Sequence, residues 1–142
     1  MKLSAKTEYA CIAMLDLAAS FGTGEPMRIR DIADRHGIQS PQFLVQILLQ
    51  LKGAGLVAST RGAAGGYKLV RPPEEISLGD VIGVMEGPAD FGGSAAPDSP
   101  AGRVLCGVWR EITEVQQQVL GAMTFAELLD RARHQTEPMY YI

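Results

Sequence analysis

The 142-residue sequence has only two cysteines, Cys11 and Cys106, and no apolar run near the ~20 residues that cross a bilayer. Two thiols so far apart predict neither a disulfide framework nor a zinc site. The opening MKLSAKTEYA lacks the pattern of a signal peptide, so we expect a cytoplasmic protein with no membrane partner. The sequence also lacks a nucleophile–base pair, catalytically spaced carboxylates and a phosphate-binding loop, which argues against an enzyme.

The charge is divided unevenly along the chain. Residues 1–71 hold nine Lys/Arg and five Asp/Glu, a balance of +4, whereas residues 72–142 hold four and eleven, a balance of −7. Such an asymmetry fits a first half that faces DNA and a second half that stays away from it. An accidental skew in a protein without a DNA partner would also fit.

The most informative stretch is 40–71, which reads as a helix followed by a two-stranded wing. Ser40 and Pro41 form a helix start, with the serine hydroxyl predicted to cap the free amides and proline in the first turn. Three- and four-residue spacing predicts one buried helix face, made of Leu44, Ile47, Leu48 and Leu51. The run Ala54-Gly55-Leu56 predicts the end of this helix.

Two short β-prone runs, Leu56–Thr60 and Tyr67–Val70, follow this helix and are joined by a glycine-rich tip. Arg61 and Lys68 give the tip positive charge, and its glycines allow a close approach to a partner. A polar helix start beside a basic wing predicts a reading helix and a wing that meets phosphate or the minor groove. A helix and hairpin without a partner is the alternative.

The remaining pattern predicts a mainly α protein with a small β wing. Helices are expected over Ser4–Ser20, with an apolar stripe that includes Phe21, over Arg30–His36, and over Leu78–Glu86. Residues 1–86 then form a winged helix-turn-helix domain. Residues 87–103, rich in Gly, Pro, Ala, Ser and Asp, predict a mobile loop before a dimerisation helix and a final short helix over 104–134. Residues 135–142 are expected to form a tail.

The helix predicted from Val104 to Gly121 carries an apolar row at four-three-four spacing, formed by Val108, Ile112, Val115 and Val119. Such a row is the seam of two helices packed side by side, and a small domain needs a partner to cover it. We therefore expect a homodimer. Packing of this row on the chain's own first helix is the alternative.

The runs MKLSAKTEYA, LKGAGLVASTRGAAGGYKLVRP, EEISLGDVIGVMEGP and TFAELL together resemble the Rrf family of winged-helix transcriptional regulators. The resemblance implies a homodimeric repressor or activator on a palindromic operator, with Ser40–Gln46 in the major groove. By family position it indicates Ser40, Gln42, Gln46 and Arg61 as DNA contacts. To these we add the basic residues and wing glycines Lys2, Lys6, Arg30, Gly62, Gly65, Gly66 and Lys68, with solvated surface as the alternative for Lys2 and Lys6. Val45 departs from a common glutamate, so the operator sequence cannot be inferred.

Well-known members of this family hold an iron–sulfur cluster on three cysteines, and Cys106 alone matches the last of them. Glu8 falls near a carboxylate ligand that some members supply. A cluster needs about four donors, so this set is incomplete and we expect no cofactor and no metal. Cys106 remains a candidate for redox or iron–sulfur sensing.

The chain ends in Met139, Tyr140, Tyr141 and Ile142, which resembles the tail of CymR-type members that regulate cysteine metabolism. It is also similar to the tail that serine acetyltransferase inserts into O-acetylserine (thiol) lyase. The resemblance implies this enzyme as a co-repressor partner, because a free carboxylate on an aromatic tail can imitate an amino-acid substrate. A tail that packs on its own dimer is the alternative.

Overall fold

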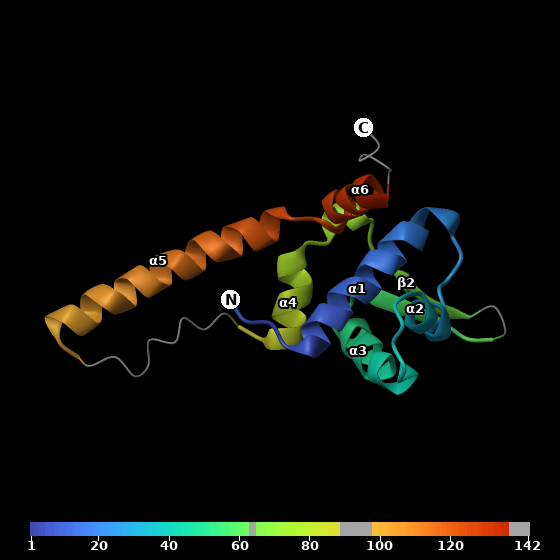
Figure 1. Ribbon diagram of the computed structural model, residues 1–142, viewed down its shortest axis with the longest axis horizontal. Helices are drawn as coiled ribbons and strands as arrows, with labels where there is room; N and C mark the ends of the chain where they lie inside the picture. The colour runs from blue at the N-terminus through green and yellow to red at the C-terminus, as the bar shows by residue number, and fades with distance from the viewer. Residues whose placement is uncertain (63–64, 89–97, 137–142) are drawn as a thin grey trace.

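A computed structural model describes residues 1–62, 65–88 and 98–136 (Figure 1). In chain order the elements are α1 (Ala5–Ser20), η1 (Phe21–Thr23), α2 (Ile29–Arg35), α3 (Pro41–Gly53), β1 (Val57–Thr60), β2 (Gly66–Leu69), η2 (Pro73–Glu75), α4 (Leu78–Glu86), α5 (Pro100–Ala122) and α6 (Phe125–Thr136). The predicted class, mainly α with a small β wing, is confirmed.

Helix α1 lies at the centre of the core and packs against α3, α4, α6 and β2 (Figure 1). Its stripe residues Met14 and Leu17 are fully buried, as are Leu48 of α3 and Phe125 of α6. Burial of such side chains is the main favourable term in folding. The expected place of Phe21 in this stripe is wrong, because α1 ends at Ser20 and a tighter 3₁₀ turn leaves the Phe21 ring 37% exposed.

Strands β1 and β2 pair in antiparallel register, from Val57 opposite Leu69 to Thr60 opposite Gly66. Val57 and Leu69 are buried, so this face of the wing packs on the helices. A short bridge between Met27 and Tyr67 adds the segment before α2 to the sheet. Each strand lies within one residue of its predicted bounds.

Helix α5 extends away from the winged domain and contacts it through α4 (Figure 1). It begins at Pro100 rather than Val104, because the Ser99 hydroxyl accepts the Gly102 amide proton at 3.1 Å and caps the helix. The end of the predicted loop is therefore helical, while residues 89–97 and the tail residues 137–142 lie outside the described residues. None of the described helices is both long and apolar enough to cross a membrane.

The apolar row of α5 faces solvent within the single chain. We call Val108, Ile112, Val115 and Val119 the α5 seam; their side chains are 40–59% exposed. Trp109 beside them is also exposed, at 43%. Packing of this row on the chain's own α1 is therefore not what the structure has.

Candidate nucleic-acid interface

The turn between α2 and α3 sets the direction of the candidate reading helix. Gly37 has φ +65°, a left-handed conformation that L-residues with a Cβ rarely adopt. The Ile38 amide then donates to the Ala33 carbonyl at 2.8 Å, which closes the end of α2. The two helices and this turn form the predicted helix-turn-helix unit.

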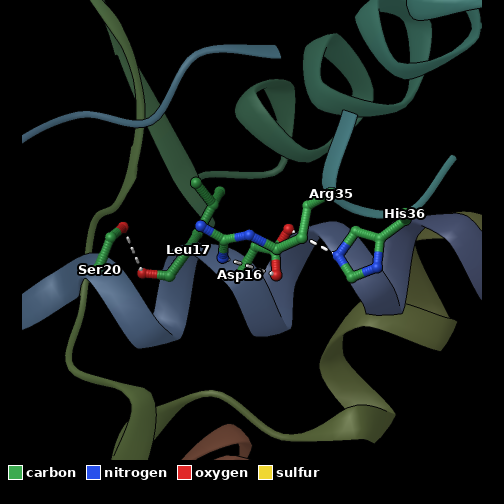
Figure 2. A network of polar contacts seen from close by, with 5 residues as sticks. All are labelled: Asp16, Leu17, Ser20, Arg35 and His36. Atoms are coloured by element: carbon green, nitrogen blue, oxygen red, sulfur yellow. Dashed lines mark hydrogen bonds and ion pairs between the residues drawn. The ribbon is translucent and has the colours of Figure 1, made fainter. Parts of the chain in front are cut away.

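An ionic network ties this unit to α1 (Figure 2). Nε2 of His36 lies 2.8 Å from Oδ2 of Asp16, and Nη1 of Arg35 lies 3.4 Å from Oδ1 of the same carboxylate. The Asp16 side chain is only 9% exposed, so its charge needs these partners. Asp16 thereby fixes the end of α2, and the turn that follows it, against the core helix.

Helix α3 presents a polar face to solvent opposite its buried leucines. Leu44, Ile47, Leu48 and Leu51 are fully buried, as predicted. Gln42 and Gln46 are exposed on the other side, together with Leu49, which is 53% exposed. We call Gln42, Gln46 and Leu49 the exposed face of α3. An exposed helix face with carboxamide groups is suited to the edges of base pairs in a major groove.

Ser40 precedes this helix and departs from its predicted role. Its hydroxyl makes no capping hydrogen bond within the described residues, and the side chain is exposed. Pro41 does occupy the first turn, where its missing N–H costs no hydrogen bond. The Ser40 hydroxyl therefore adds a polar group beside the exposed face of α3.

The wing stands beside α3 and is linked to it by Lys52. Its Nζ donates to the Ser59 hydroxyl of β1 at 2.8 Å, which joins the C-terminal end of α3 to the wing. Arg61 and Gly62 are exposed where the wing tip begins, and Gly62 has φ +105°. The wing tip thus places the cation of Arg61 next to Gly62, whose backbone conformation is unfavourable for residues with a Cβ.

At two other positions of the wing, local packing explains why the residue is glycine. A Cβ on Gly65 would lie 2.3 Å from the Thr60 carbonyl oxygen, and one on Gly66 would lie 2.5 Å from the Met27 carbonyl oxygen. Both positions therefore need glycine for the hairpin and for the bridge to the segment before α2. Residues 63 and 64, between Gly62 and Gly65, lie outside the described residues.

The other predicted cations are more widely spread. Arg30 is exposed on α2 and Lys6 is half-buried on α1. Lys68 points away from the core and lines a groove with Phe21 and Glu25. Lys2 lies beside α4 and α5 instead, where it lines a separate cavity. The structure thus places Ser40 directly before the exposed face of α3, and β1, which leads to Arg61, packs against the same helix. Lys2 is not grouped with them, because it lines the cavity beside α4 and α5.

Sequence reasoning missed the residues that hold the interface in place, namely Asp16, Gln50 and Lys52. Gln50 donates from Nε2 to the Val84 carbonyl of α4 at 3.1 Å, across 34 positions of sequence. These contacts have no short-range sequence signal, because each joins segments that meet only in the fold. The exposed leucine at position 49 was also missed, although it breaks the helix's apolar spacing.

The cysteines do not supply a site for an iron–sulfur cluster. Burial, and secondarily the nearby Glu8 carboxylate, raise the pKa of the Cys11 thiol to about 11, which keeps it protonated and a poor ligand. Cys106 is half-buried on α5, and the sequence has no third cysteine. Over residues 1–62, 65–88 and 98–136, no three His, Cys, Asp or Glu side chains come together as a metal site. The donor set does not fit a cluster that needs about four ligands.

Comparisons with known proteins agree with this geometry. Residues 3–131 match the Rrf2 family, described as "Iron-dependent Transcriptional regulator". The chain is 36% identical over 143 residues to the HTH-type transcriptional regulator CymR of Bacillus subtilis, covering 100% of each protein. The solved structure of T. potens IscR superposes with a TM-score of 0.80 at 38% identity, covering 99% of this chain and 95% of that one. The solved structure of B. subtilis CymR gives 0.79 at 35% identity, covering 92% and 98%.

Proposed function

Because the chain belongs to the Rrf2 family of DNA-binding transcriptional regulators, we propose that it is a homodimeric repressor that reads a palindromic operator. Its relatives are named as regulators of transcription and not as enzymes. The observation that carries the proposal is the exposed face of α3, on a helix that packs against a wing whose tip begins with Arg61. Gln42 and Gln46 read base edges in this proposal, and Arg61 meets phosphate or the minor groove.

The α5 seam supports the homodimer. Four branched apolar side chains exposed in one row lose contact with water only if a second helix covers them. A second copy of the same row is a self-complementary partner, and a two-fold dimer places two α3 helices on the two halves of a palindrome. The Ser40, Gln42 and Gln46 set of each protomer then reads one half-site.

The finer proposal is regulation of cysteine metabolism through the tail Met139–Ile142, which lies outside the described residues. The relative CymR is called the global cysteine regulator of B. subtilis, and this supports the assignment. In the proposal the tail enters the active site of O-acetylserine (thiol) lyase, and its α-carboxylate occupies the place of the substrate's carboxylate. The enzyme then acts as a co-repressor.

Fluorescence anisotropy with DNA from the region upstream of the gene tests both operator binding and the co-repressor role of the enzyme. The purified protein is titrated with and without O-acetylserine (thiol) lyase, in parallel with a chain that ends at Met139 and so lacks Tyr140–Ile142. We expect salt-dependent preference for upstream DNA over random DNA in both chains. The enzyme should tighten binding of the intact chain alone, and O-acetylserine should reverse this effect.

Two outcomes would contradict the proposal separately. Equal affinity for upstream and random DNA at every salt concentration would refute the operator-reading function. Normal operator binding that the enzyme leaves unchanged in the intact chain would refute the co-repressor function alone.

The alternative is a regulator that senses oxidants or iron–sulfur chemistry through Cys106. At 3.6 residues per turn, Cys106 lies about 150° around α5 from the centre of the α5 seam, so a disulfide between two facing α5 helices is disfavoured. A Cys106→Ser variant should bind the operator with the affinity of the wild type. Its response to peroxide should also be the same as that of the wild type. Loss of a peroxide response in that variant would support the alternative instead.

A further inference from the structure

Helices α4 and α5 touch at one end and separate toward the other. A Cβ on Gly79 would lie 3.3 Å from the backbone of Leu120 and Gly121, so the two helices are in close contact there. One turn further along α4, a Cβ on Gly83 would meet no described atom within 4 Å. The space that opens between the helices is a cavity of about 270 Å³, which we call the α4–α5 cavity.

The cavity wall carries groups of both charges. Lys2 contributes an ammonium group and Glu86 a carboxylate, while Thr113, Gln116 and Gln117 of α5 add neutral polar groups. Ile82 and Leu120 supply apolar surface. At ~30 Å³ for each water, the volume corresponds to about nine water molecules, or a ligand of similar non-hydrogen atom count.

Hydrogen bonds from Ser4 and Thr7 hold the Glu86 carboxylate in place in this wall. Its Oε2 accepts the Thr7 hydroxyl, the Ser4 hydroxyl at 2.9 Å and the Ser4 amide at 3.2 Å. These bonds, the one from Thr7 first, lower the pKa of the Glu86 carboxyl and keep it ionised at neutral pH. All three donors go to Oε2, and no other described residue donates a hydrogen bond to Oε1, so this oxygen is the acceptor considered for a ligand ammonium group.

We propose that the α4–α5 cavity binds a small zwitterionic α-amino acid and that this ligand regulates DNA binding by changing the angle between α4 and α5. Lys2 receives the ligand carboxylate, Glu86 receives its ammonium group, and the carboxamides of Gln116 and Gln117 contact its side chain. The inference rests on the proposed DNA-binding dimer for its regulatory consequence, but ligand binding itself is independent of it.

The position of the cavity permits binding in the dimer. At 3.6 residues per turn, the cavity-lining residues of α5 lie about 120° around the helix from the α5 seam. The two α5 helices can therefore stay packed while the ligand enters. Each winged domain contacts its α5 through α4, so a changed α4–α5 angle alters the spacing of the two α3 helices and hence operator affinity.

Thermal unfolding of the full chain with individual L-amino acids as probes tests the binding step. For each one, the matching amine without carboxylate and acid without amine serve as controls. At saturation we expect at least one amino acid to raise Tm by about 5 °C, and neither fragment to do so. Absence of a shift with every amino acid, or an equal shift with the fragments, would overturn the inference.

A matched pair of glycine variants locates the site. Gly83→Leu fills the cavity, whereas Gly107→Leu makes the same change on an exposed turn of α5, where a Cβ also meets no described atom within 4 Å. The Tm shift should disappear in the first variant and persist in the second. A shift that persists in Gly83→Leu would place the ligand elsewhere and overturn the assignment. Glu86→Gln, which keeps the hydrogen-bond acceptor for Ser4 and Thr7, should weaken ligand binding at least 10-fold.

Anisotropy with upstream DNA then tests the coupling and separates the two proposals. The amino acid identified above should change operator affinity at least 5-fold in the wild type and leave Gly83→Leu unchanged. Operator binding that ignores the ligand would refute the regulatory step while the proposed function stands. A ligand-dependent Tm shift in a protein that prefers no DNA would instead refute the proposed function and keep the cavity as a binding site.

Discussion

Helix α3 buries its row of apolar residues, whereas helix α5 exposes its own. Helix α3 buries a complete row of leucine and isoleucine side chains and exposes glutamines. Helix α5 is longer, yet the described structure buries only Gly102 and Leu120 of it and leaves a row of valine and isoleucine exposed.

The contrast indicates which kind of partner surface each helix would gain most from contacting. A helix anchored by its apolar face presents polar groups, and these gain little from an apolar partner but can pair with base edges and phosphates. A helix that exposes its apolar face gains most from an equally apolar surface. The proposed function therefore gives one chain two interfaces of different chemistry, with the α5 seam for a second copy and the exposed face of α3 for DNA.

The largest effect is expected from breaking the α5 seam. The double substitution Ile112→Glu and Val115→Glu places four carboxylates at the centre of a dimer, so the dimer should dissociate to monomers in light scattering. Because two linked half-sites bind far more tightly than one, operator affinity should fall about 1000-fold. Gln118→Glu, which adds one carboxylate per chain outside the seam where the double variant adds two within it, is the control. A dimer that survives the double substitution would show that another surface holds the protomers together.

A neighbouring pair on α3 gives the next largest effect. Leu48 is fully buried and Leu49 is 53% exposed. Leu48→Ala should lower the free energy of unfolding by about 2–5 kcal/mol through the lost contacts and the cavity left behind. Leu49→Ala should change it by less than about 0.5 kcal/mol, measured by urea unfolding of both variants. Similar losses in the two variants would contradict the assignment of inner and outer faces.

A smaller effect is expected at the network that orients α3. Asp16→Asn removes the charge that faces His36 and Arg35, and should destabilise the protein by about 1 kcal/mol, since Arg35 is half exposed. Urea unfolding measures this change, and anisotropy should show weaker operator binding as the α2–α3 turn loosens. Asp34→Asn changes an exposed carboxylate on α2, the helix that carries Arg35, and should leave both quantities unchanged. If the two variants have the same free energy of unfolding and the same operator affinity, Asp16 does not orient α3.

The smallest effect is confined to alkaline pH. Burial raises the pKa of the Cys11 thiol from 9.0 to about 11, so the folded state favours the protonated form. The unfolded chain loses this proton first, and stability should therefore fall between about pH 9 and pH 11. Thermal unfolding across this pH range should show a smaller loss of stability in Cys11→Ala than in the wild type. An identical pH dependence in wild type and variant would contradict the raised pKa.

The sequence predicted what depends on periodicity and on local caps. The buried row of α3 and the bounds Leu78–Glu86 of α4 agree with the structure. Apolar spacing is a short-range signal, and so is the cap of α4, in which the Ser77 hydroxyl accepts the Asp80 amide proton. Phe21 was misplaced because a 3₁₀ turn ended the helical phase, and the start of α5 was missed because its cap lies in a loop-like composition. The contacts of Glu86 with Ser4 and Thr7 join residues about 80 positions apart, which spacing cannot reveal.

The central claim is that the exposed face of α3 reads DNA sequence, and a specificity ratio tests it most directly. The affinities of wild type and of the double variant Gln42→Ala and Gln46→Ala are measured for upstream and for random DNA at one salt concentration. The account predicts that affinity for upstream DNA falls about 10- to 100-fold, while affinity for random DNA, which depends on phosphate contacts, stays unchanged. An equal fall on both DNAs, or no fall on either, would contradict it.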